Sequence, residues 1–311
     1  MTRWPQSFGD ATAEYAAARE AAGFVGGESA LLWAVGSDTM SFLQNILSQD
    51  VEALPPGHVA RSFLLQPRGK LEALLWLLRG EDRVGIVTGA DRREETLRTM
   101  SRWRLRVDVD LVPDAREVFD VWGPAPAMLD VAGGWRDEDG ILVAEVSDSP
   151  IRHRLVAGLG VSDLEHRGLQ PIGRHAHTTL RIETGEPRFG LDIDHKTIPQ
   201  ESGLVPEAVS FTKGCFLGQE LVARIDSRGR VNRNLRGVRM LEPVIPPIGA
   251  RVTHAGKLVG TLTSVAESPA MRAPIAMALI RREAPPGTRV RVSWEQGETE
   301  AMIEQLPLLA D

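Results

Sequence analysis

The sequence predicts an α+β protein made of two interleaved α+β units and a smaller β-barrel at its C-terminal end. Up to about residue 240, helix-like and strand-like segments alternate without the strand–helix–strand repeats of a parallel sheet. From residue 241 onward the segments are short, strand-like and separated by proline and glycine turns. The chain has 311 residues, 42% of them hydrophobic, which is enough for about two domains with their own cores. We therefore expect a first region at residues 1–240 and a barrel at residues 241–311.

Capping residues and apolar spacing place the N-terminal elements. Asp10 is suited to cap an alanine-rich helix over residues 11–22. Ser37 or Asp38 can cap a second helix, and Asp91 a third. The second helix has an apolar face formed by Phe42, Leu43, Ile46 and Leu47. Between the second and third helices, three consecutive antiparallel strands are predicted from the stretches RSFLLQ, LEALLWLL and VGIVTG.

The elements that follow are predicted in the same way. Four strands are expected in VDVDLV, REVFDVWG, ILVAEVSD and RHRLVAG, with a short helix in PAPAMLDVAG. Residues 172–185 are expected to be helical, and residues 186–219 to form a long ordered loop, which in a compact domain is more often functional than idle. The barrel strands are expected in LEPVIPPIGARV, GKLVGTLTSV, IAMALIRR, TRVRVSW and ETEAMIEQL.

Composition narrows the classes of function. One cysteine cannot form a disulfide within the chain or supply a four-cysteine iron–sulfur cluster. The sequence has no targeting pattern and no apolar run long enough for a membrane helix, so we expect a cytoplasmic protein, and we expect it to be a monomer. The net charge of −6 argues against a nucleic-acid-binding surface over the whole protein. His175 and His177 diverge on a helix, so no metal site is predicted.

The single cysteine lies in the stretch FTKGCFLGQELVARIDSRGR. Lys213 precedes Cys215 by two residues, and QELVARID predicts a helix whose N-terminus faces the loop. Both features favour a thiolate. Gly214 and Gly218 let the backbone come close to a ligand. The alternative is that Cys215 is a small buried core residue, and the local features leave both interpretations open.

Two further features suggest binding. Glu183, beside Arg181, can accept two N–H donors from the edge of a planar heterocycle such as a pterin, whereas the alternative is a surface ion pair with Arg181 or Arg188. Residues 224–239 contain six arginines and one aspartate. This stretch is either a solvated face or a site for an anion or RNA. The candidate contacts are Arg224, Arg228 and Arg230.

The chain resembles the YgfZ-type folate-binding proteins, which are relatives of the glycine-cleavage T protein, an aminomethyltransferase. The resemblance covers most of the chain and is most specific in RIETGEPRFGLDID, IPQESGL and KGCFLGQELVARIDSRG. It implies a cloverleaf of the two α+β units and the barrel around a central tetrahydrofolate, with Glu183 holding the pterin. The resemblance further implies a signature loop that includes Lys213, Gly214, Cys215, Gly218, Gln219 and Glu220.

The sequence departs from the transferase relatives at their catalytic aspartate. That residue falls at Ala73 or Leu74, and the nearby Glu72 has the opposite strand parity to position 73. The pair that contacts folate in the transferases appears as Gly89-Ala90. Tyr15 is the only tyrosine, so several tyrosines cannot line a pterin pocket.

The resemblance and these departures lead to one principal hypothesis and two alternatives. We expect a tetrahydrofolate-binding accessory protein for iron–sulfur cluster assembly or repair, which supports tRNA modification indirectly and has iron–sulfur proteins or assembly factors as partners. Cys215 is then the candidate reactive thiol, assisted by Lys213. The first alternative is a folate-dependent aminomethyl or methyl transferase of the T-protein class. The second is a module that binds RNA or protein through residues 224–239.

Overall fold

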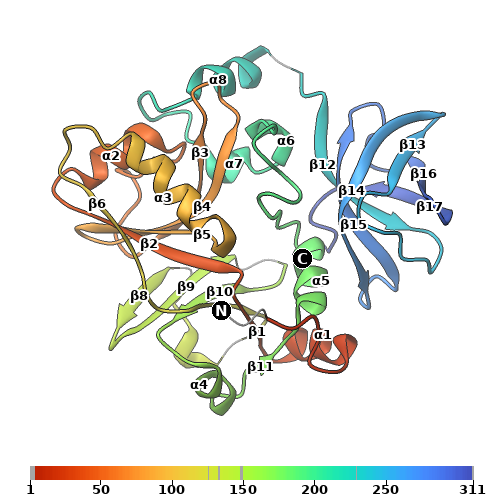
Figure 1. Cartoon of the computed structure of the whole chain (residues 1–311), viewed down its shortest axis with the longest axis horizontal. Coiled ribbons are helices and arrows are strands. Elements are labelled where there is room, and N and C mark those ends of the chain that lie inside the picture. The colour runs from red at the N-terminus through yellow and green to blue at the C-terminus, as the bar shows by residue number, and fades with distance from the viewer. Residues whose placement is uncertain (1–3, 125, 132–133, 148–149, 229, 310–311) are drawn as a thin grey trace.

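The chain folds into two β-sheets with associated helices and a separate closed barrel (Figure 1). α5 (Arg174–Glu183) lies between the barrel and the two sheets. This arrangement confirms the predicted α+β fold with a C-terminal barrel. The structure is a computed structural model that describes residues 4–124, 126–131, 134–147, 150–228 and 230–309.

The first sheet has five strands in the order β3-β4-β5-β2-β6. Its strands β3, β4 and β5 are consecutive and antiparallel, as the three apolar stretches predicted. The unit consists of β2 (Ser29–Val35), α2 (Thr39–Ile46), β3 (Val59–Leu65), β4 (Leu71–Arg79), β5 (Arg83–Gly89), η1 (Ala90–Arg92), α3 (Arg93–Arg102) and β6 (Asp110–Pro113).

The second sheet has six strands in the order β11-β1-β7-β10-β9-β8. β1 joins this sheet although β2, the next strand along the chain, joins the first sheet, and this exchange interleaves the two units as predicted. The unit consists of α1 (Ala11–Glu20), β1 (Gly23–Gly26), β7 (Val118–Trp122), η2 (Ala127–Leu129), β8 (Trp135–Glu138), β9 (Ile141–Ser147), β10 (His153–Ala157), α4 (Val161–His166) and β11 (Gln170–Pro171).

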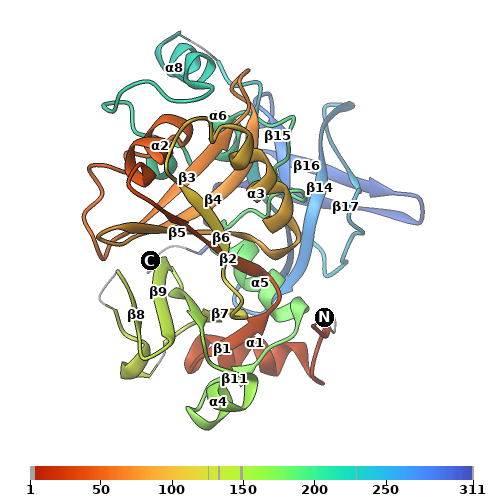
Figure 2. The ribbon, with the colours of Figure 1, turned by 60° about the vertical axis from the view of Figure 1, so that its left-hand side comes forward.

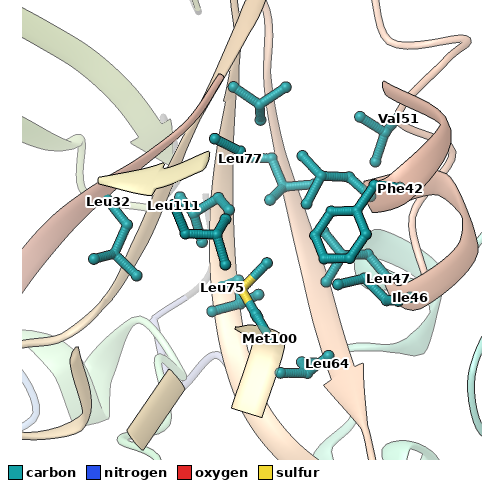
Figure 3. Close-up of a cluster of buried hydrophobic side chains, with 14 of the residues drawn as sticks. Leu32, Phe42, Ile46, Leu47, Val51, Leu64, Leu75, Leu77, Met100 and Leu111 are labelled. Carbon is teal, nitrogen blue, oxygen red and sulfur yellow. The ribbon is translucent and has the colours of Figure 1, made fainter. Parts of the chain in front are cut away.

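Strand alternation gives β4 two different faces. Leu75 and Leu77 are buried on one face, where the apolar side of α2 packs with Phe42 (Figure 3). The other face carries Leu74 and Trp76, which are half-buried. In Figure 2 the first sheet lies above the second, and side chains of both sheets share an apolar cluster. The half-buried face of β4 is therefore available to form a site between the units.

The predicted caps are confirmed at one helix and wrong at another. Asp10 Oδ1 accepts hydrogen bonds from the amides of Thr12 at 2.8 Å and Ala13 at 3.2 Å, so Asp10 caps α1 as predicted. α1 ends at Glu20, two residues earlier than expected. Asp38 precedes α2, but its carboxylate accepts from the Asp108 amide at 2.8 Å and does not cap the helix.

The predicted long loop contains two short helices, α6 (Pro199–Ser202) and α7 (Val205–Ala208). Proline occupies the first turn of both, where its missing N–H costs no hydrogen bond. α8 (Gln219–Arg228) follows, as predicted from QELVARID. The stretch PAPAMLDVAG yields only the single 3₁₀ turn η2.

The barrel closes in the order β12-β15-β14-β13-β16-β17. Its first strand begins at Arg233, before the predicted start of the barrel at residue 241. This strand is rich in arginine, so its buried positions at Leu235, Val238 and Met240 do not stand out as an apolar run. The strands are β12 (Arg233–Met240), β13 (Arg251–His254), β14 (Lys257–Ser268), β15 (Ala273–Arg281), β16 (Arg289–Trp294) and β17 (Gly297–Glu304).

Candidate functional site

A cavity lies where both sheets meet α5 and the segment that follows it, and we call it the central cavity. None of its lining residues comes from the barrel. The lining residues are Glu28, Ser29, Leu74, Trp76, Val87, Thr88, Gly89, Asp120, Trp122, His153, Leu155, His177, Arg181, Glu186, Pro187, Arg188 and Phe189.

The first sheet gives the cavity an apolar wall. Leu74 and Trp76 come from the half-buried face of β4, and Arg61 stacks on Trp76 with its guanidinium carbon 4.1 Å from the ring centroid. Of the two positions to which the transferase aspartate can correspond, Ala73 is buried in the opposite core and Leu74 lines the cavity. The side chain in the cavity at this point is therefore a hydrocarbon that cannot accept a proton.

The second sheet gives the cavity a polar wall. Asp120 and Trp122 are two positions apart on β7, so their side chains lie on the same face of the sheet. His153 on β10 is the direct cross-strand partner of Trp122. The His153 ring stacks on Trp122 with centroids 4.1 Å apart, and its Nε2 lies 2.9 Å from Asp120 Oδ1. Ser29 Oγ donates to the same carboxylate oxygen at 3.1 Å. Neighbours on both sides thus hold the Asp120 carboxylate in place.

Several polar atoms of this wall are buried without a protein partner. Asp120, Trp122 and His153 expose only 4%, 1% and 5% of their surfaces. Among the residues that the structure describes, Asp120 Oδ2, Trp122 Nε1 and His153 Nδ1 have no hydrogen-bond partner. An unsatisfied buried polar atom costs about 1–3 kcal/mol, and folded proteins contain few of them. Atoms of this kind on a cavity wall are expected where a ligand supplies the missing partners.

Glu28 lines another part of the cavity and is held by two arginines. Its Oε1 lies 2.8 Å from Arg174 Nη1, and its Oε2 lies 3.0 Å from Arg188 Nη1. Burial raises the pKa of Glu28, although both arginines oppose that rise. The cavity therefore contains an acidic group whose charge is balanced by nearby guanidinium groups.

α5 contributes His177 and Arg181. Burial, followed by the charge of Arg181, holds the pKa of His177 well below its usual value of 6.5, so its imidazole is neutral near pH 7. Arg181 Nη1 lies 2.5 Å from Asp192 Oδ2, and its Nη2 donates to Ser264 Oγ at 2.6 Å. Arg181 is therefore engaged in a bridge from the cavity wall to the barrel.

Glu183 lies on a different side of α5. It is fully buried, and its two carboxylate oxygens accept from the Tyr15 hydroxyl at 3.0 and 2.9 Å. Ser268 Oγ also donates to Oε1, and Arg19 Nη1 lies 3.6 Å from Oε2. Burial raises the pKa of Glu183. Glu183 is thus neither a surface ion-pair partner of Arg181 or Arg188 nor a lining residue of the central cavity.

The Tyr15 contact was not anticipated from the sequence. The only signal was a single tyrosine within an otherwise alanine-rich helix. Its burial and its bond to Glu183 raise the pKa of the hydroxyl, so it acts as a proton donor in this bond. The pair ties α1 to α5, and Ser268 extends the link to the barrel.

The signature loop, residues 211–220, lies outside the central cavity. Cys215 is exposed, which excludes the buried-core interpretation. Lys213 Nζ donates to the backbone oxygens of Gln44 at 2.6 Å, Leu47 at 2.8 Å and Gln49 at 2.8 Å. All three ammonium donors are therefore used at the C-terminal end of α2. Burial lowers the pKa of Lys213 to about 8.

The two glycines of the loop have different environments. Gly218 has φ +78°, and a Cβ there would lie 2.6 Å from the backbone oxygen of Gln66, so only glycine fits. Gly214 has no positive φ, and a Cβ there would meet nothing within 4 Å. The fold requires glycine at position 218 and does not require it at position 214.

The remaining loop and arginine candidates contact the protein itself or face solvent. Gln219 Oε1 accepts from the Phe216 amide at 3.2 Å at the start of α8. Glu220 and Arg224 form an exposed pair one helical turn apart. Arg230 is exposed, and the Arg228 side chain lies outside the described residues.

The arginines of β12 do not form a free basic face. Arg233 Nε lies 2.6 Å from Glu201 Oε1, and Arg239 Nη2 lies 3.0 Å from Glu304 Oε1. Residues 233–239 of the arginine-rich stretch thus belong to the barrel, and Arg233 and Arg239 are held in ion pairs. In the described ranges no cluster of three or more potential metal ligands is found, and every helix is too short or too polar to cross a membrane.

Comparison with known proteins gives two family matches. The profile of the GCVT N-terminal domain matches residues 3–131, and that of the glycine cleavage T-protein C-terminal barrel domain matches residues 233–309. The second match begins at the first residue of β12, in agreement with the barrel observed.

Curated relatives and a solved structure extend over nearly the whole chain. The aminomethyltransferase of Bacillus subtilis is 28% identical over 336 aligned positions, covering 97% of this chain and 92% of that protein. The aminomethyltransferase of Nostoc sp. PCC 7120 is also 28% identical, covering 89% and 81%. The crystal structure of the glycine cleavage system aminomethyltransferase T from Bartonella henselae superimposes with a TM-score of 0.87 at 21% identity, covering 99% and 92%. The whole cloverleaf is therefore shared.

Proposed function

Because the chain belongs to the glycine-cleavage T-protein superfamily, we propose that it binds tetrahydrofolate or a close derivative in the central cavity and serves in one-carbon transfer of the aminomethyltransferase class. The single observation that carries this proposal is the pairing of an apolar wall with a wall of buried polar atoms that lack protein partners. Such a combination is typical of sites for flat heterocycles.

The residues of the cavity fit a reduced folate. Leu74, Trp76 and Phe189 offer apolar surface for the ring system, and Asp120 and Trp122 offer one acceptor and one donor for its polar edge. Tetrahydrofolate supplies the nitrogen that accepts a one-carbon unit. The protein's own residues would bind the ring, orient it and exclude water from it.

The chain differs from the transferase pattern in where a proton can be held. The resemblance places the catalytic aspartate of the transferases at Ala73 or Leu74, and the hydrocarbon side chain of Leu74 cannot accept a proton. Glu28 and the Asp120–His153 pair are acidic and basic groups on the cavity wall that can hold a proton instead. The proposed transfer therefore depends on groups other than the side chain at position 74.

Calorimetric titration with tetrahydrofolate tests the location of the site. The variant Leu74→Trp fills the cavity, and we expect it to lose measurable binding while it stays folded. Leu258→Trp, on the exposed surface of the barrel, is the matched control and should bind as the wild type does. Unchanged binding by Leu74→Trp would place the folate elsewhere.

A second candidate function follows from the signature loop, because Cys215 is exposed and Gly214 has no structural need to be glycine. An accessible thiol beside an unobstructed backbone suits contact with a partner protein. We propose on this ground a YgfZ-type accessory role toward iron–sulfur proteins, which supports tRNA modification indirectly. Complementation of a strain deficient in iron–sulfur enzymes tests it. Cys215→Ser should fail to complement, whereas Ser210→Ala in the adjacent turn should complement fully.

A further inference from the structure

The polar wall of the central cavity has a donor and acceptor pattern that limits what can bind there. Asp120 Oδ1 is already used by His153 Nε2 at 2.9 Å and by Ser29 Oγ at 3.1 Å. Asp120 Oδ2 remains as an acceptor. Trp122 Nε1 can only donate, and His153 Nδ1 accepts when the ring donates from Nε2 to the carboxylate.

Sheet register brings these groups together on one face. Asp120 and Trp122 are two residues apart on β7, so both side chains project from the same side of the sheet. His153 faces Trp122 directly across the strand pair, and Leu155 faces Asp120. All four residues line the central cavity. The face therefore presents a carboxylate oxygen, an indole N–H and an imidazole nitrogen beside a hydrocarbon.

The ligand edge that matches this face has N–H donors next to a carbonyl acceptor. The amino-pyrimidinone ring of a folate has such an edge, with an amino group and a ring N–H beside an oxygen. A carboxylate that accepts N–H donors forms stronger hydrogen bonds than a neutral acceptor does. Glu183 offers no comparable position, because its oxygens are occupied by Tyr15 and Ser268 and it does not line the cavity.

We propose that Asp120, oriented by His153 and Ser29, is the carboxylate that receives the N–H edge of the bound heterocycle, and that Trp122 Nε1 donates to its carbonyl oxygen. This inference rests on the proposed binding of a folate in the central cavity. His153 is a positioning residue through its bond to Asp120. It also offers Nδ1 to a further donor of the ligand.

The variant Asp120→Asn tests this inference by calorimetry with two probes, tetrahydrofolate and 6-methyltetrahydropterin, which lacks the tail of the folate. The amide keeps an acceptor for His153 and Ser29 but turns a donor toward the donors of the ring. We expect affinity for both probes to fall by the same factor, about tenfold to a hundredfold. Thermal unfolding without ligand should stay close to that of the wild type, which a merely structural role would not predict.

Glu183→Gln is the matched control, since it neutralises another buried carboxylate, which lies on α5 and does not line the central cavity. It should leave both affinities within a factor of about two. If Asp120→Asn does not fold, His153→Gln carries the test, with a loss of several-fold expected for both probes.

The outcomes separate the two proposals. If the wild type binds neither probe, the proposed folate site fails and the inference fails with it. If the wild type binds, Asp120→Asn binds equally well and Glu183→Gln binds weakly, the folate site stands and the assignment to Asp120 is overturned. A loss for tetrahydrofolate but not for 6-methyltetrahydropterin would also overturn it, because Asp120 would then contact the tail.

Discussion

The signature loop and the central cavity use their polar residues in opposite ways. In the loop, Lys213 and Gln219 direct their polar groups to the protein's own backbone, and Gly218 lets the loop pack closely against the turn between β3 and β4. In the cavity, Asp120 and Trp122 keep buried polar atoms without protein partners. The signature loop thus mainly anchors neighbouring elements of the protein. The wall of the central cavity that is suited to a ligand is formed by strand residues that belong to no sequence motif.

The strongest test of this contrast is Lys213→Met. Removal of the ammonium group takes the Lys213 donor away from three carbonyl oxygens at the end of α2, of which that of Leu47 is buried and those of Gln44 and Gln49 are half-buried. We expect the free energy of unfolding in urea to fall by about 3 kcal/mol or more. Lys196→Met, at an exposed position, is the control and should change stability by less than about 0.5 kcal/mol. A loss below about 1 kcal/mol for Lys213→Met would show that the loop is not anchored through this side chain.

A smaller difference is expected between the two glycines of the loop. Gly218→Ala places a Cβ 2.6 Å from a backbone oxygen at φ +78°, so we expect a loss of about 2 kcal/mol. Gly214→Ala should leave the stability within about 0.5 kcal/mol of the wild type, because its Cβ meets open space. Chemical unfolding of the pair measures both values. Equal losses would contradict the separation of a structural from a non-structural glycine.

The pH dependence of stability distinguishes Glu183 from a ligand-binding carboxylate. Burial raises the pKa of Glu183 above its unfolded value of 4.5, so the native state binds more protons in the window between the two values. Its contribution to stability is fully present below about pH 4.5 and is lost as the pH rises through the native pKa. In measurements of the free energy of unfolding against pH, Glu183→Gln should lack this fall. If the variant and the wild type have identical profiles, the Glu183 carboxyl is not the source of the pH dependence.

The smallest effect is expected for Cys215→Ser. The thiol is exposed and none of the cavity residues depends on it, so both the thermal stability and the affinity for tetrahydrofolate should match those of the wild type. Differential scanning fluorimetry and calorimetry check the two quantities. A marked loss of folate affinity would show that the signature loop contributes to the folate site, and would contradict the difference between the loop and the cavity.

Local sequence patterns predicted most of the helices and strands, but not the shortest helices or the first strand of the barrel. β3, β4 and β5 were predictable because apolar residues and turns mark strands directly, and Asp10 marked the start of α1. α6 and α7 were missed because helices of one turn are too short to show a helical period. The start of the barrel was missed because outward-facing arginines conceal the buried residues of β12.

The site was predictable only where its residues are close in sequence. The loop around Cys215 was found because its signature is contiguous. Asp120 and His153 lie 33 positions apart and become neighbours only through the register of β7 and β10. The available signals were a carboxylate within the apolar stretch VFDVW and a histidine within HRLVA, and neither reveals its partner. Glu183 was predicted either to hold a pterin or to form a surface ion pair, and the sequence does not show that its carboxylate faces Tyr15.

The most direct test of the central claim is a calorimetric comparison of Asp120→Asn and Cys215→Ser titrated with tetrahydrofolate. We predict a loss of affinity of about tenfold or more for Asp120→Asn and no change for Cys215→Ser. Loss of binding by Cys215→Ser together with full affinity in Asp120→Asn would contradict the assignment of the ligand to the central cavity.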